Sequence, residues 1–140
     1  MYAPVNQLGH KVDEARTCGR ALGLLVDRVA LIEHLERGMP LTVRDRVWHE
    51  KRDALVQLDE LEQSLLRPGF FSFLSCAHCK IPSDLNLRPF QVHHDGDFIV
   101  WDIRPPGADT FYEDYELVRF RFHRSQYEKA IQKMLLSAVR

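Results

Sequence analysis

The sequence has few cysteines, no surplus of charge and no long hydrophobic run, and each shortage excludes a class of protein. Its 140 residues include 19 basic and 20 acidic side chains, so the formal net charge is −1. Binding to nucleic acid through bulk charge requires a surplus of lysine and arginine, so we expect no nucleic-acid partner. The longest mostly apolar stretch, residues 21–35, is interrupted by Asp27 and Glu33 among others, whereas a membrane span needs about 20 residues without such charges. We therefore expect no contact with the membrane interior.

The cysteine count and the N-terminal residues indicate the compartment. Cys18, Cys76 and Cys79 are an odd number of thiols in a chain long enough to build its own core, which favours a reducing environment. The first residues contain neither the basic region nor the apolar stretch of a signal peptide. We expect a cytoplasmic protein with a single domain over residues 1–140.

The first half of the chain, residues 5–67, is predicted to form an antiparallel helical hairpin. Apolar residues recur every three or four positions through 5–37, which is typical of one long helix. A second helix is predicted from Thr42, a favourable N-cap, to the break at Pro68. Gly19 and Gly23 inside the first helix indicate close approach of another backbone, either the rest of this chain or a second copy in a homodimer.

The second half, residues 69–140, is predicted to form an antiparallel sheet of three to four strands with a C-terminal helix packed on it. Asp95-Gly96 is a strong two-residue turn signal, which indicates a β-hairpin over residues 90–103 with side chains on alternate faces. A third strand is predicted near residues 116–122. A capping box of Ser125 and Glu128 begins the last helix, which runs to about Val139. The hairpin residues expected on the core face are Phe90, Val92, Ile99, Trp101 and Ile103. The predicted fold class is α+β.

The cysteines and histidines are the candidates for metal or thiol chemistry. Cys76 and Cys79 have the two-residue spacing with which two thiolates chelate zinc, and His93 is a candidate third ligand. Adjacent strand residues point to opposite faces, so His93 and His94 do not both bind one ion. We predict no catalytic residue, metal site or cofactor. The alternative is a zinc-stabilised domain, or a small metal- or thiol-dependent enzyme, centred on Cys76, Cys79 and the His93–Asp97 hairpin.

The most informative segment is an acidic and aromatic stretch before the third strand. Aromatic side chains are favoured at interface hot spots, and clustered acids steer basic partners. The residues predicted to bind the partner are Asp109, Phe111, Tyr112, Glu113, Asp114, Tyr115 and Glu116. We therefore predict a protein that binds another protein with a basic surface and occludes it stoichiometrically, as an inhibitor, an immunity-type antitoxin or an adaptor does.

Overall fold

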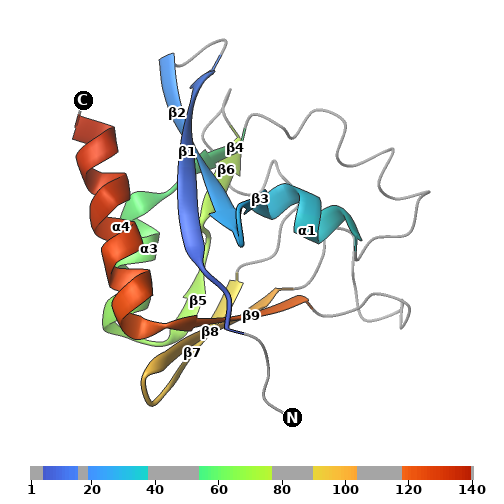
Figure 1. Cartoon of the computed structure of the whole chain (residues 1–140), viewed down its shortest axis with the longest axis vertical. Helices are drawn as coiled ribbons and strands as arrows, with labels where there is room; N and C mark the ends of the chain where they lie inside the picture. The colour runs from blue at the N-terminus through green and yellow to red at the C-terminus, as the bar shows by residue number, and fades with distance from the viewer. Residues whose placement is uncertain (1–4, 16–18, 38–53, 77–89, 104–117, 140) are drawn as a thin grey trace.

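The computed structural model describes residues 5–15, 19–37, 54–76, 90–103 and 118–139. This described part of the chain contains three antiparallel sheets and three helices (Figure 1). The strands are β1 (Leu8–Ala15), β2 (Gly19–Val26), β3 (Val29–Ala30), β4 (Ala54–Val56), β5 (Gly69–Phe71), β6 (Leu74–Cys76), β7 (Phe90–Asp95), β8 (Phe98–Ile103) and β9 (Val118–His123). The helices are α1 (Leu31–Arg37), α3 (Leu58–Leu66) and α4 (Arg124–Val139).

The prediction of an N-terminal helical hairpin is wrong. Instead, β1 and β2 pair as antiparallel strands, and β3 extends their sheet. Residues four apart, such as Leu8 and Val12, share a face in a strand as well as in a helix, so their spacing does not separate the two. A glycine costs about 1 kcal/mol in a helix interior. In the sheet Gly23 instead makes room for the stem of Lys11, whose Cγ would lie 3.2 Å from an added Cβ.

The turn between β2 and β3 is held by the residues that precede β1. Asp27 and Arg28 both have positive φ angles, 54° and 68°, as a type I′ turn requires. The Asp27 carboxylate accepts hydrogen bonds from the Gln7 amide (2.8 Å) and from Asn6 Nδ2 (2.7 Å). The Asp27 amide donates in turn to the Gln7 carbonyl at 2.9 Å. These bonds offset the conformational strain of two L-residues in the left-handed region.

The second predicted helix is correct only over Leu58–Leu66. Ala54–Val56, assigned to the same helix from the sequence, forms strand β4 and pairs with Leu74–Cys76 of β6. The expected stop at Pro68-Gly69 is confirmed, because β5 begins at Gly69. The predicted start at Thr42 lies outside the described residues.

The predicted β-hairpin of residues 90–103 is confirmed, with its turn one residue later. The chain reverses at Gly96 and Asp97, so Asp95 pairs with Phe98 and Val92 with Trp101. Gly96 has a φ of +59° and takes the first central position, where a type II′ turn requires glycine. Compared with the predicted pairing, each residue of β7 pairs with a partner two positions further along β8. A shift by two keeps every side chain on its predicted face, so the five predicted core residues are buried.

The last strand and the last helix are also confirmed. Phe120 and Phe122 of β9 are buried, and Arg119 and Arg121 occupy the opposite face. The helix α4 begins at Arg124. His123 takes the place of the cap predicted for Ser125, because its Nδ1 accepts a hydrogen bond from the Ser125 amide at 3.3 Å.

The core lies between the four-stranded sheet, ordered β5-β7-β8-β9, and the other elements. Figure 1 shows α3, α4 and the β1–β2 hairpin on the same side of this sheet. The indole of Trp101 is fully buried at the centre of an aromatic cluster. Its ring partners are Phe73, Phe90, Phe120, Phe122 and Tyr127. None of the helices in the described ranges has the length and hydrophobicity needed to span a lipid bilayer.

Candidate functional site

The face of the four-stranded sheet that points away from the core gathers charged and aromatic side chains. Strand pairing places Phe70, Gln91, Asp102 and Arg119 in one row across all four strands. The next row contains His93, Val100 and Arg121. We call this surface the outer face; its residues are Phe70, Gln91, His93, Asp95, Phe98, Val100, Asp102, Arg119, Arg121 and His123.

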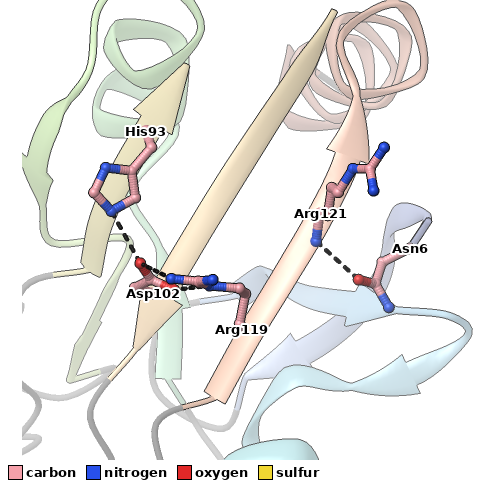
Figure 2. Close-up of polar contacts among 5 residues, drawn as sticks. All are labelled: Asn6, His93, Asp102, Arg119 and Arg121. Carbon is pink, nitrogen blue, oxygen red and sulfur yellow. Dashed lines mark hydrogen bonds and ion pairs between the residues drawn. The ribbon is translucent and has the colours of Figure 1, made fainter. Parts of the chain in front are cut away.

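Asp102 is the centre of a hydrogen-bond network on the outer face. Its carboxylate accepts bonds from Arg119 Nε at 2.5 Å and from Arg119 Nη2 at 3.0 Å. It also contacts His93 Nε2 at 2.9 Å (Figure 2). The side chain is only 7% exposed, although it points away from the core. The Arg119 hydrogen bonds hold the pKa of Asp102 below its ordinary value of 3.8, and His93 adds to this effect while burial opposes it.

Arg119 is fixed at one edge and accessible at the other. Its hydrogen bonds with Asp102 raise the pKa of the guanidinium and involve only Nε and Nη2. The side chain is 64% exposed, so its Nη1 end can contact another molecule. An arginine oriented in this way loses less conformational entropy when it binds a carboxylate or another oxyanion.

Arg121 is held by an aromatic ring and by the backbone. Its Cζ lies 3.8 Å from the centroid of the Phe98 ring, a close cation–π contact. Its amide donates to Asn6 Oδ1 at 2.8 Å (Figure 2), and its carbonyl accepts from the Asn6 amide at 2.7 Å. Within the described ranges, Arg121 Nε is buried without a hydrogen-bond partner. Stacking on Phe98 therefore orients this second guanidinium.

Asn6 connects the outer face to the N-terminal sheet. It forms a parallel bridge with Phe122 in β9, the last strand of the four-stranded sheet, while its Nδ2 bonds to Asp27. Asp27 is part of the β2–β3 turn, so Asn6 connects Arg121 to the N-terminal sheet. The position of Arg121 therefore depends on that sheet as well as on the four-stranded sheet that contains it.

The candidate ligand His93 and its neighbour His94 are separated by the fold. His93 points to the outer face, and His94 contacts the Ser64 carbonyl through Nε2 at 2.7 Å on the opposite side. The two imidazoles therefore lie on opposite faces of the sheet, as the alternation of strand residues predicts. Among the residues that the structure describes, no group of three or more His, Cys, Asp or Glu side chains converges.

The other candidates from the sequence fall largely outside this site. The backbone of Cys76 in β6 pairs with Ala54 in β4, in the two-stranded sheet rather than in the four-stranded sheet that carries the outer face, and Cys79 lies outside the described residues. The predicted partner-binding residues also lie outside them: Asp109, Phe111, Tyr112, Glu113, Asp114, Tyr115 and Glu116.

Sequence reasoning missed Asp102 and Phe70. The signal for Asp102 was its place as the one acid in the strand sequence Phe-Ile-Val-Trp-Asp-Ile, on the side opposite the core residues. Phe70 is 69% exposed in β5, a three-residue strand whose position was not predicted from the sequence.

The fold and the site together describe a sheet-rich mixed α/β protein with an oriented pair of arginines on the sheet face that points away from the core. Comparisons with protein-family models, with curated proteins and with solved structures find no match to this chain.

Proposed function

We propose that this chain is a small cytoplasmic protein that binds another protein and occludes a surface of it stoichiometrically. The observation that carries the proposal is the composition of the outer face, which combines exposed aromatic surface with two oriented guanidinium groups. Aromatic residues and arginine are enriched at protein interfaces and dominate their binding energy. Inhibitors, immunity-type antitoxins and adaptors are the kinds of protein that act in this way.

The apolar part of the outer face supports a protein partner. Phe70 is 69% exposed at one end of the row that ends at Arg119. Phe98 and Val100 are half-buried on the same face. A partner that covers this row gains apolar burial at Phe70 and a charged hydrogen bond at Arg119. That combination matches the pattern of an anchor surrounded by polar contacts.

The acidic segment 109–116 is included in the proposal because it connects two strands that carry the outer face. It lies in the chain between β8 and β9, whose ends Ile103 and Val118 pair with each other beside Asp102 and Arg119. We propose that its acids and aromatic rings contact a basic part of the partner. Binding affinity for Tyr112→Ala and Asp114→Lys tests this part, and unchanged affinity in both would remove the segment from the contact.

Site-specific photo-crosslinking in the native cell tests the proposal. A benzoylphenylalanine replaces Phe70 in one variant and Lys129, an exposed residue of α4, in the control. We expect one discrete adduct from position 70 and none from position 129. The same set of adducts from both positions would contradict a specific surface on the sheet.

The captured protein then allows a quantitative test. Calorimetry with the purified partner should give one partner per chain. Phe70→Ala should weaken the affinity by about 2 kcal/mol, the usual scale of an interface anchor. An unchanged affinity would remove the outer face from the interface.

A further inference from the structure

We infer that the outer face binds a carboxylate of its partner, in an acidic peptide segment that lies across β8 and β9 at Arg119 and Arg121. This inference rests on the proposed function and adds the chemistry of the partner. It implies a partner with an acidic group beside the basic surface expected to face segment 109–116.

The first argument is the spacing of the two arginines. They are two residues apart on β9, so their Cα atoms are separated by about 7 Å along the strand and their side chains leave the same face. A single extended acidic segment can therefore reach both guanidinium groups.

The second argument is that both arginines are oriented before any ligand binds. Asp102 holds Arg119 through Nε and Nη2, and the Phe98 ring holds Arg121 through stacking. The planar end of a guanidinium binds a carboxylate through two parallel hydrogen bonds. An incoming carboxylate therefore meets the donors of Arg119 already in place, without the ordering cost of a flexible side chain.

The third argument concerns the charges that face this position. Asp102 neutralises one of the two arginines, and Asp95 lies on the same side of the hairpin, three residues before Phe98. His93 and His123 are the titratable groups on the flanking positions. This mixed set suits isolated carboxylates. A phosphodiester chain carries a charge at every nucleotide and would meet both aspartates.

The probe, called the glutamate oligomer, is a ten-residue peptide with two glutamates two positions apart in a glycine–serine background. It is titrated into the ¹⁵N-labelled full chain and followed by the arginine Nε–H and backbone amide resonances. We expect shifts at Arg119, Arg121 and the β8–β9 amides, and none along α4. Arg119→Gln should weaken binding about tenfold, the loss of a hydrogen bond to a charged group. Lys129→Gln, which removes an exposed positive charge from α4, should leave binding unchanged.

Arg119→Lys separates the oriented guanidinium from simple charge. It keeps a cation beside Asp102, so the sheet retains its ion pair, but it lacks the planar donor pair. We expect weaker binding than in the wild type. Full affinity in Arg119→Lys, or equal loss in Lys129→Gln, would reduce the interaction to non-specific attraction and overturn the inference.

A ten-residue oligothymidylate is titrated in parallel. Binding of the oligonucleotide at the same resonances, as tightly as the glutamate oligomer, would overturn the inference in favour of a nucleic acid. The crosslinks from position 70 do not depend on Arg119. A glutamate oligomer that fails to bind, with those crosslinks intact, would reject the partner chemistry and leave the proposed function standing.

Discussion

Asp102 combines burial with an orientation away from the core, and its charge determines whether Arg119 is held. Its three hydrogen-bond contacts come from two neighbouring strands, so the carboxylate links β7, β8 and β9 across the sheet. Loss of the charge would release Arg119 and His93 together.

We expect Asp102→Asn to lower the free energy of unfolding by about 2 kcal/mol at neutral pH, the scale of hydrogen bonds to a charged group. The pKa of Asp102 is lowered in the folded state, so its stabilising contribution is fully present above the unfolded value of about 3.8. That contribution is lost as the pH falls through the lowered folded pKa. Urea denaturation from pH 7 to pH 2 should therefore show the two proteins converging in acid.

Asp95→Asn provides the matched control for this pH series, because Asp95 is an exposed residue of the same hairpin. Its stability should stay close to that of the wild type throughout. A constant difference between wild type and Asp102→Asn at every pH would show that the carboxylate charge contributes nothing.

At the scale of the elements, the β2–β3 turn keeps two L-residues in the left-handed region. We expect Arg28→Gly to raise the free energy of unfolding by about 1 kcal/mol, because glycine adopts a φ of 68° without steric cost. Thermal denaturation measures the effect. Arg28→Ala is the control, since alanine keeps the penalty of a β-carbon, and an equal gain in both variants would contradict the explanation.

The same turn explains why the N-terminal strands were not predicted. Asp-Arg lacks the glycine or asparagine that marks most two-residue hairpin turns. The bonds from Asn6 and Gln7 that stabilise it come from about 20 residues earlier in the chain, beyond the range of a local pattern. In contrast, residues 90–103 carry their own turn signal in Gly96, and their alternate positions 90, 92, 99, 101 and 103 are all apolar. Their strands and core face were therefore predictable.

The candidate site was predictable only in part for a related reason. The outward direction of Arg119 and Arg121 follows from alternation along a single strand. The pairing of Arg119 with Asp102, 17 residues away, follows from the register of β8 on β9. That register is set by packing of the core face, which no local motif specifies.

At the scale of the whole molecule, one buried chain of hydrogen bonds joins α3, α4 and the four-stranded sheet. Ser64 Oγ donates to the Leu61 carbonyl at 2.5 Å and contacts Tyr127 Oη at 2.6 Å. Because the single Ser64 proton is committed, Tyr127 donates to Ser64 and accepts from Trp101 Nε1 at 3.2 Å. Burial raises the pKa of Tyr127, so the hydroxyl keeps the proton that this direction requires.

We expect Tyr127→Phe to lower the free energy of unfolding by about 2 kcal/mol, because it leaves the buried Trp101 N–H without its acceptor. Ser64→Ala removes the other end of the chain. The double variant should lose less than the sum of the two single losses, as interacting residues do in a double-mutant cycle. Strict additivity in urea denaturation would show that the hydroxyls do not act together.

The buried position of Trp101 also allows folding to be followed by intrinsic fluorescence. The chain has two tryptophans, Trp48 and Trp101, so Trp48→Phe leaves one indole, which is fully buried and bonded to Tyr127. The emission of that indole should move to longer wavelength when water reaches it. Stopped-flow fluorescence of this single variant would thus measure the rate at which α3 and α4 pack onto the four-stranded sheet, without an added dye.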